Sequence, residues 1–348
     1  MQRRELLTSY AGRVIGGERL VHAEAAEILA VPHEHVFHLL ASANDVRRHF
    51  KGDSVDLCVI VNAKSGACSE DCAYCAQSAH HDTDAPVYPL MSQTKILEHA
   101  RAAESVGANK FSLVTSGNSI QSEEDIEHIR AALEAVARET ALDRCGSLGS
   151  VSRDRLKTLK AAGLQGLHHN IETAESFFDE ICSTHTYADR IRTVRLAQES
   201  GFYVCSGGIF GMGESTEQRI EMALALRELN VDSVPLNFLN PIPGTRLENA
   251  EPMHPLDILK TIALFRFILP DKDIRICGGR EHNLRSLQPL MYAAGANGAM
   301  VGNYLTTRGR DSNEDIQMIE DLGLRAAGGG TLTIHHDTGT TKPFSAKT

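Results

Sequence analysis

The chain has 348 residues, of which 45 are acidic and 35 basic, so its formal net charge is -10. No basic run or basic-aromatic stripe interrupts this acidic balance, which excludes nucleic acid as an expected partner. The eight cysteines are too sparse for a secreted disulfide scaffold, and their clustering favours metal binding in a reducing compartment.

Residues 1–45 are expected to form an N-terminal helical extension. The segment ERLVHAEAAEILA spaces its apolar residues three and four apart, which is the period of a helix. The first residues, MQRRELLTSYAGR, lack the apolar core of a signal peptide, and the apolar stretch TIALFRFILP is too short to span a bilayer. We therefore expect a soluble, cytoplasmic protein that has no membrane partner.

After this extension, short apolar and β-branched runs alternate with segments of helical period that often begin after Ser or Thr and stop at Gly. Such alternation implies parallel strands, and eight units predict a (β/α)8 TIM-type barrel over residues 46–323. The alternative is an open doubly wound sheet. Residues 324–348 lack a sustained pattern and are expected to be a disordered tail. The eight runs are VDLCVIVN, KFSLVTS, RCGSLGS, GLHHNIE, FYVCSGGIF, DSVPLNFLN, DIRICGG and GAMVGN.

The stretch GACSEDCAYCAQS places Cys68, Cys72 and Cys75 in a C-x3-C-x2-C array directly after the first predicted strand. A loop in this position lies on the face of the barrel where active sites are built. A 4Fe-4S cluster held by three thiolates keeps one iron free for a substrate or cofactor. The alternatives are a group of redox thiols, or a zinc site completed by His80 or His81, since structural zinc normally takes four ligands.

Three further cysteines, Cys145, Cys205 and Cys277, fall in the third, fifth and seventh predicted strands. Alternate strands of a small barrel contribute side chains to shared interior layers, so these thiols are expected to converge. Arg275 would point to the same side as Cys277, and a buried arginine needs an anionic partner such as a cluster or a carboxylate. The alternative is plain burial of small hydrophobic residues. Plain burial or exposure is expected for the two remaining cysteines, Cys58 and Cys182.

Polar residues are expected at the same end of the barrel. In the fourth strand, His168, Asn170 and Glu172 alternate and so share one side, whereas His169 would face the helices. The glycines of GGIFGMGES are expected to let the backbone approach a ligand closely, although they lack the spacing of a dinucleotide-binding loop. Two other polar candidates are Asn237, inside an apolar run, and Arg190, early in a helix. For each, the alternative is a satisfied polar or surface group.

The spacing C-x3-C-x2-C is the signature of the radical S-adenosylmethionine superfamily. Together with HHNIET, VCSGGIFGMGE, SVPLNFLNPIPGT, RICGGRE and AGANGAMVGNYLTT, it resembles the biotin synthase family over about residues 45–323. The resemblance implies a 4Fe-4S cluster on the three loop cysteines, where a reductant protein such as flavodoxin or ferredoxin drives cleavage of S-adenosylmethionine. The 5'-deoxyadenosyl radical then takes hydrogen from dethiobiotin, and an auxiliary iron-sulfur cluster supplies the sulfur of biotin. Homodimers are usual in the family.

The resemblance also implies roles for single residues. Tyr74 matches a residue packed near the adenine of S-adenosylmethionine, and Arg190 matches a contact to its methionine carboxylate. Glu172 matches a ribose contact, although the family usually has Asp there. Asn170 and Asn237 match positions that bind dethiobiotin.

One departure from the family concerns the auxiliary cluster. The usual 2Fe-2S cluster is held by three cysteines and an arginine, which match Ser112, Cys145, Cys205 and Arg275 here. Serine is a poor substitute for a soft thiolate on iron. Cys277 stands where the family usually has a small residue that binds no metal. We therefore hypothesise an atypical auxiliary cluster of 4Fe type, with an extra sulfide, on the three strand cysteines, and Arg275 as a charge partner. A 2Fe-2S cluster that uses Ser112 is the alternative.

Two competing functions remain at this point. A related radical enzyme, such as a hydrogenase maturase or a methylornithine synthase, would keep the first cluster but need not keep the strand cysteines. A non-catalytic iron-sulfur carrier would leave the polar residues of the barrel mouth without a role.

Overall fold

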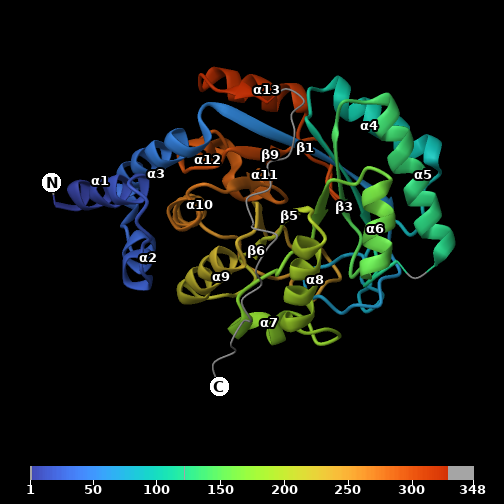
Figure 1. Cartoon of the computed structure of the whole chain (residues 1–348). Helices are drawn as coiled ribbons and strands as arrows, with labels where there is room; N and C mark the ends of the chain where they lie inside the picture. Colours follow the sequence, from blue (N-terminus) through green and yellow to red (C-terminus); the bar gives the residue numbers. More distant parts are fainter. Residues whose placement is uncertain (1, 121, 328–348) are drawn as a thin grey trace.

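Figure 1 shows the computed structural model, which describes residues 2–120 and 122–327. Its strands form a closed parallel barrel in the order β1-β2-β3-β4-β5-β7-β8-β9, and β9 pairs back to β1 through Asp56 and Gly298. Because β5 and β6 both pair with β7, they share one of eight strand positions. Closure confirms the predicted TIM-type barrel and excludes the open sheet. The strands are β1 (Ser54–Lys64), β2 (Lys110–Thr115), β3 (Asp143–Ser147), β4 (Gly166–His168), β5 (Tyr203–Cys205), β6 (Gly208–Phe210), β7 (Ser233–Phe238), β8 (Asp273–Ile276), β9 (Gly298–Met300) and β10 (Arg325–Ala326).

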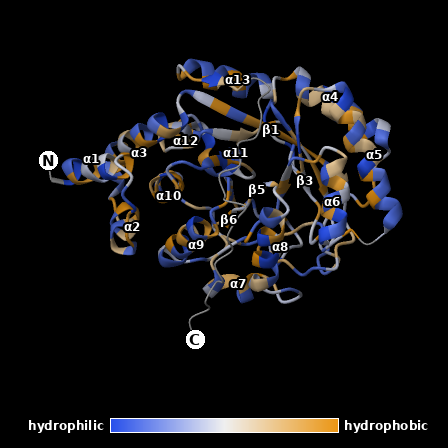
Figure 2. Ribbon diagram, viewed as in Figure 1, coloured by the Kyte–Doolittle hydropathy of each residue, from blue (hydrophilic) through white to orange (hydrophobic). Residues whose placement is uncertain are grey.

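Helices follow the strands and cover the outside of the barrel. Four of them begin at a hydroxyl cap that accepts a backbone N–H, at Ser92, Ser122, Thr186 and Ser215, as the sequence predicts. Figure 2 shows polar and apolar residues interleaved along α4 and α5, as expected of helices with one buried stripe. The helices are α1 (Gln2–Ile15), α2 (His22–Leu29), α3 (Val36–Lys51), α4 (Gln93–Ser105), α5 (Glu123–Glu139), α6 (Arg153–Ala161), α7 (Glu175–Ile181), α8 (Tyr187–Glu199), α9 (Thr216–Leu229), α10 (Pro255–Ile268), α11 (Arg280–Leu284), α12 (Leu290–Ala293) and α13 (Ser312–Asp321).

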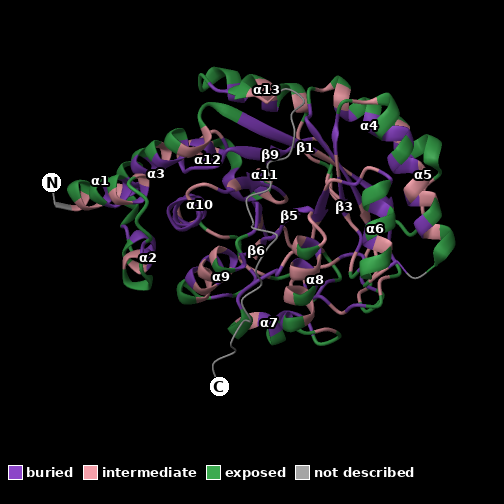
Figure 3. Ribbon diagram, viewed as in Figure 1, coloured by how far each residue is buried: buried purple, intermediate pink, exposed green. Residues whose placement is uncertain are grey.

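The N-terminal extension is helical, as predicted, and α3 continues to Lys51, past the predicted boundary at residue 45. Helices α2 and α3 pack on α10, which is buried along its length (Figure 3). This burial on all sides explains why the apolar stretch TIALFRFILP shows no polar face. Among the described residues, no helix is long and apolar enough to cross a membrane.

The predicted tail, residues 324–348, lies mostly outside the described residues. Its first part is ordered, because Arg325 and Ala326 form β10 and pair with Ser54 and Val55 at the start of β1. The C-terminal segment is therefore attached to the barrel at least as far as Ala327, whose N–H donates to Val55 O.

Candidate active site

A cavity of about 590 Å³ opens at the C-terminal ends of the strands. In a TIM barrel, this is the face that carries the active site. The cavity wall contains eight of the residues singled out from sequence: Cys68, Cys72, Tyr74, Cys75, Asn170, Glu172, Arg190 and Asn237. The loop after β1 and the ends of β4 and β7 thus meet around one space, as the alternation of strands and helices predicts.

The three-cysteine loop is held by its own backbone. Cys68 donates its N–H to Gln77 O, and the N–H of Cys75 donates to Cys72 O, both at 3.0 Å. Gly66 starts the loop with a φ of 75°, and a Cβ there would lie 2.6 Å from Val87 Cγ2, so the turn requires glycine. Burial raises the pKa of the Cys75 thiol to about 11. Bare thiolates are therefore disfavoured there, and a metal cluster is the partner that would stabilise them.

The histidines near this loop contact backbone carbonyl groups, and among the described residues neither belongs to a group of three His, Cys, Asp or Glu ligand atoms close enough to hold a metal ion. His80 Nε2 lies 3.0 Å from Ser69 O, and His81 Nδ1 lies 2.9 Å from Cys75 O. Each ring thus has one nitrogen on a carbonyl group, so both contribute to the fold of the loop. Nothing in this geometry favours the zinc alternative.

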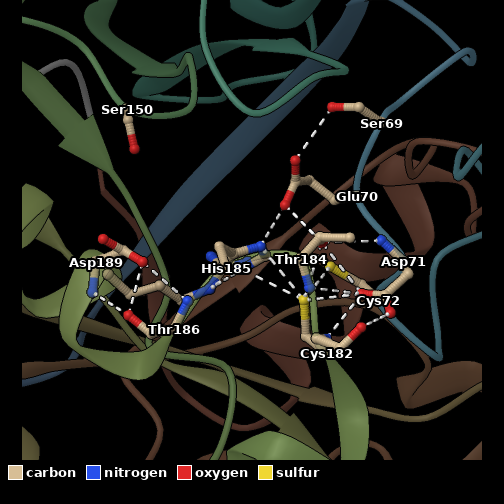
Figure 4. A network of polar contacts seen from close by, with 12 residues as sticks. Ser69, Glu70, Asp71, Cys72, Ser150, Cys182, Thr184, His185, Thr186 and Asp189 are labelled. Carbon is tan, nitrogen blue, oxygen red and sulfur yellow. Dashed lines mark hydrogen bonds and ion pairs between the residues drawn. The ribbon is translucent and has the colours of Figure 1, made fainter.

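A polar network fastens the loop to the turn between α7 and α8 (Figure 4). Asp71 accepts the N–H groups of Ser183 and Thr184, at 2.9 and 3.2 Å. Glu70 accepts from Thr184 Oγ1 at 2.7 Å and meets His185 Nδ1 at 2.5 Å. The sequence analysis missed these partners, because their spacing in the chain, more than a hundred residues, gives no local signal.

Glu172, Asn170 and Arg190 form one group in the cavity wall, in which Glu172 is buried and the other two are half-buried. Glu172 Oε1 lies 3.3 Å from Arg190 Nη1, and Asn170 Nδ2 donates to Glu172 Oε2 at 3.2 Å. Although burial disfavours its charged form, Arg190 has a raised pKa because the Glu172 carboxylate is close. Burial raises the pKa of Tyr74 well above its ordinary value, so its phenol is neutral. The cavity therefore offers a cation, a carboxylate and an aromatic ring side by side.

Asn170 and Asn237 line the same cavity together with His168 and His169. Asn237 Nδ2 donates to Gly208 O at 3.1 Å, which fixes its side chain between β6 and β7. His168 Nε2 meets Asn170 Oδ1 at 2.9 Å. The expectation that His169 faces the helices is wrong, since His169 also lines the cavity. Strand β4 ends at His168, so the alternation of sides stops before His169.

The glycines after β5 approach other backbone. A Cβ on Gly207 would lie 2.0 Å from Pro235 O, and one on Gly208 would lie 2.0 Å from Glu172 O. Gly208 forms an isolated parallel bridge with Glu172, and Ile209 N donates to Glu172 O at 2.9 Å. The predicted approach to a ligand stays a prediction; at Gly207 and Gly208 the close neighbours are backbone atoms of Pro235 in β7 and of Glu172.

Below the cavity, the interior of the barrel holds buried thiols. Cys145, Cys205 and Cys277 are less than a tenth exposed, and desolvation raises the pKa of each. Arg275 lies with them, because its Nη1 donates to Cys205 Sγ at 3.9 Å. Cys145 and Cys277 are electrostatic neighbours of Arg275 and Cys205, so the four residues lie in one buried group, and none of them lines the upper cavity.

A fourth thiol belongs to this group. Cys58 on β1 is buried, and its pKa is raised to about 11, first by desolvation and in part by Asp56 and Cys205. Cys58 is also close enough to Cys145 and Cys277 for a thiolate at Cys58 to raise the pKa of each. The expectation of plain burial for Cys58 therefore overlooked the other thiols near it. The signal was available, because β1 is the first strand of the barrel and the other three thiols belong to its third, fifth and seventh strand positions.

The surroundings of these thiols suit a bound inorganic group. The buried Ser112 Oγ and Arg275 Nε have no hydrogen-bond partner among the described residues, and such atoms require an explanation. Gly166 pairs with Cys145, and a Cβ there would lie 2.7 Å from the Cys145 sulfur. Glycine in this place keeps the space beside the thiol open. Soft thiolates next to an unpaired guanidinium N–H match an anionic iron-sulfur cluster.

A closed parallel barrel with a three-cysteine loop at its mouth defines a radical S-adenosylmethionine enzyme fold. The model of the Radical SAM superfamily matches residues 63–227, and that of the Biotin and Thiamin Synthesis associated domain matches residues 235–325. The biotin synthase of Geotalea uraniireducens is 53% identical, covering 92% of this chain and 98% of the relative. That of Clostridium acetobutylicum is 48% identical, covering 91% and 97%. The chain belongs to the biotin synthase family, and membership implies a 4Fe-4S cluster and S-adenosylmethionine.

Solved structures agree at the level of the fold. A methylornithine synthase superposes with a TM-score of 0.81 at 21% identity, covering 92% of this chain and 98% of the other. The hydrogenase maturase HydG from Carboxydothermus hydrogenoformans reaches 0.76 at 17% identity, covering 93% and 79%. At such identities the likeness shows a shared fold alone.

Proposed function

We propose that this chain is a biotin synthase, which inserts sulfur into dethiobiotin to form biotin. The observation that carries the proposal is the pairing of a three-cysteine loop at the cavity with a second group of buried thiols beneath it. Relatives at about 50% identity over more than nine-tenths of the chain carry the same name. A hydrogenase maturase or methylornithine synthase activity has no such support, because those proteins share only the fold.

Cys68, Cys72 and Cys75 are the proposed ligands of the 4Fe-4S cluster, which supplies the electron that cleaves S-adenosylmethionine. Arg190, held by Glu172, is placed to bind the methionine carboxylate of that cofactor. Tyr74 would pack near its adenine. These side chains fix the cofactor in one orientation, which matters because a primary radical attacks whatever atom is nearest.

Asn170 and Asn237 are the proposed contacts to dethiobiotin. Each amide is already fixed by backbone, since Gly207 N donates to Asn170 Oδ1 and Gly278 N donates to Asn237 Oδ1. Amides held in this way recognise a ureido ring without a cost of reorganisation. The substrate would thus lie between the cofactor and the interior thiols.

The auxiliary cluster is proposed to bind Cys145, Cys205 and Cys277 as an atypical 4Fe type with an extra sulfide for donation. Arg275 would offset its negative charge. In the 2Fe-2S alternative, Cys58 is a better fourth ligand than Ser112, because a thiolate suits iron and a serine hydroxyl does not. Iron and sulfide counts together with Mössbauer spectra distinguish the two clusters.

Anaerobic turnover tests the function. Reconstituted protein is mixed with dithionite, S-adenosylmethionine and dethiobiotin, and the products are identified by mass spectrometry. We expect biotin together with 5'-deoxyadenosine. Formation of 5'-deoxyadenosine without biotin would indicate a different radical reaction, and failure to cleave S-adenosylmethionine would favour an iron-sulfur carrier.

Single-thiol variants test the auxiliary ligands. Cys277→Ala should alter the auxiliary Mössbauer signal while the signal of the first cluster persists, and Cys58→Ala should do so only in the 2Fe-2S alternative. An unaltered auxiliary signal in Cys277→Ala removes this residue from the ligand set.

We further infer a cytoplasmic homodimer that receives electrons from a flavodoxin or ferredoxin. Eight free cysteines suit a reducing compartment. Sedimentation analysis of the purified chain tests the dimer, and turnover with each reduced carrier in place of dithionite tests the donor.

A further inference from the structure

Cys182 lies behind the three-cysteine loop, at the end of α7, where its Sγ is 3.9 Å from Cys72 Sγ. Both side chains are buried, with 2% and 7% of their surface exposed. Cys72 lines the cavity and Cys182 does not, and Figure 4 shows Cys182 among Asp71, Thr184 and His185. A molecule that enters the cavity would therefore meet Cys72 before Cys182.

Backbone contacts on both sides hold the two thiols together. Ala73 N donates to Ile181 O at 2.8 Å, immediately beside the two cysteines in sequence. Asp71, next to Cys72, accepts the N–H of Ser183, next to Cys182, at 2.9 Å. The distance between the sulfurs is thus set by the fold, and it must shorten by about 2 Å for a sulfur-sulfur bond to form.

A second metal site is the obvious alternative, because Cys72, Cys182 and His185 place one ligand atom each within 4.8 Å of the others. Both nitrogens of His185 are engaged, however. Nδ1 meets Glu70 Oε2 at 2.5 Å, and Nε2 accepts from Arg190 Nε at 3.0 Å. Metal binding would break one of these contacts and free a buried charge, which is costly. The histidine therefore serves the loop network and not a metal ion.

We propose that Cys182 is a resolving thiol, which forms a reversible disulfide with Cys72 when the 4Fe-4S cluster has been lost and a hydroperoxide is present. The Cys72 sulfur, as its thiolate, first attacks the hydroperoxide; the O–O bond breaks, the thiol proton passes to the leaving oxygen, and a sulfenic acid remains while water or an alcohol leaves. The Cys182 sulfur, as its thiolate, then attacks the sulfenic sulfur; the S–O bond breaks, a sulfur-sulfur bond forms, and the leaving hydroxide takes the Cys182 proton as water. Two thiols are oxidised and one peroxide bond is reduced, so atoms and electrons balance.

The disulfide would protect Cys72, a proposed cluster ligand, from irreversible oxidation. A sulfenic acid without a neighbouring thiol proceeds to sulfinic acid, which is not readily reversed, whereas a disulfide returns to thiols with a reductant. Cys182 is suited to this role because it has little exposure of its own and touches the cysteine that the cavity exposes. The inference rests on the proposed function only for the identity of Cys72 as a cluster ligand.

Peptide mapping of the full chain tests the inference without turnover. Protein stripped of iron under anaerobic conditions is treated with hydrogen peroxide and digested without reduction. We expect a linked peptide pair that contains Cys72 and Cys182 and is two hydrogens lighter than the separate peptides. Dithiothreitol should restore the free thiols and the capacity to bind iron and sulfide.

Cys182→Ser is the variant that isolates the thiol, because a hydroxyl of similar size can keep the contacts to Asp71 and Thr184. After the same treatment, it should carry Cys72 sulfinic acid and lose most of its capacity to rebind iron and sulfide. Ser183→Ala is the matched control on the same turn and should behave as wild type.

Two results would overturn the inference. One is a wild-type disulfide that joins Cys72 to Cys68 or Cys75 in place of Cys182. The other is an equal amount of Cys72 sulfinic acid in wild type and Cys182→Ser. The wild-type map alone decides the first, so the inference stays testable even if the variant does not fold.

Discussion

At the scale of single residues, Glu172 combines two unusual properties. Its backbone is in the left-handed region, with a φ of 69°, and its carboxylate is the buried partner of Arg190. A non-glycine residue in this region is uncommon, and such strain persists where the surroundings enforce it. Here Gly207 O accepts the N–H of Glu172, and Ile209 N in β6 donates to Glu172 O. The glutamate side chain reaches Arg190 at 3.3 Å.

Glu172→Gln should therefore destabilise the protein. The amide leaves Arg190 buried without a counter-charge, and breaking one side of a buried pair costs about 3 kcal/mol or more. The free energy of unfolding of the cluster-free chain in urea measures this loss. The double variant Glu172→Gln with Arg190→Leu should lose less than the sum of the two single variants. Additive losses would contradict the pairing.

At the scale of elements, the sequence predicted which segments form strands and helices better than it predicted where these elements end. The eight apolar runs and the hydroxyl caps are local patterns, and both were confirmed. The short length of β4 was not predictable, because the residues after His168 keep the alternation of a strand while their hydrogen bonds go to Gly207 and Cys205. The prediction that His169 faces the helices was wrong for this reason. Cys182 and Glu70 escaped notice because only the fold brings their segments together.

The segment Gly207–Gly208 gives the second prediction, for Gly208→Ala. The added methyl group would lie 2.0 Å from Glu172 O and 2.7 Å from Met222 Cε. The bridge between Gly208 and Glu172 must therefore open. Overpacking of this kind costs about 2 kcal/mol. Thermal unfolding should show the loss, and binding of S-adenosylmethionine to the reconstituted protein should weaken because Glu172 moves.

The matched control for this prediction is Gly12→Ala. Gly12 lies inside α1 and has no atom within 4 Å of an added Cβ, so the change should raise stability by about 0.5 kcal/mol through helix propensity. Equal effects of the two variants would mean that the close contact at Gly208 is relieved without cost.

At the scale of the whole molecule, buried ion pairs join the first strand of the barrel to strands on either side of it. Asp56 on β1 pairs with Arg275 on β8, across the seam where β9 returns to β1, and with Lys110 on β2 at 2.7 Å. The sequence predicted that a buried Arg275 needs an anionic partner, but it named a cluster or a substrate. The structure supplies Asp56 as well, through a contact between distant strands that no local pattern encodes.

Asp56→Asn should therefore weaken closure of the barrel itself. Arg275 and Lys110 would face each other inside the protein without their shared carboxylate, and the cost of such a buried charge is about 3–5 kcal/mol. Urea unfolding of cluster-free protein should show this loss, whereas Asp154→Asn, an exposed change on α6, should show almost none. Because a bound anionic cluster would return a counter-charge to Arg275, reconstitution should recover part of the lost stability in Asp56→Asn. Its failure to do so would place Arg275 outside the electrostatic reach of the auxiliary cluster.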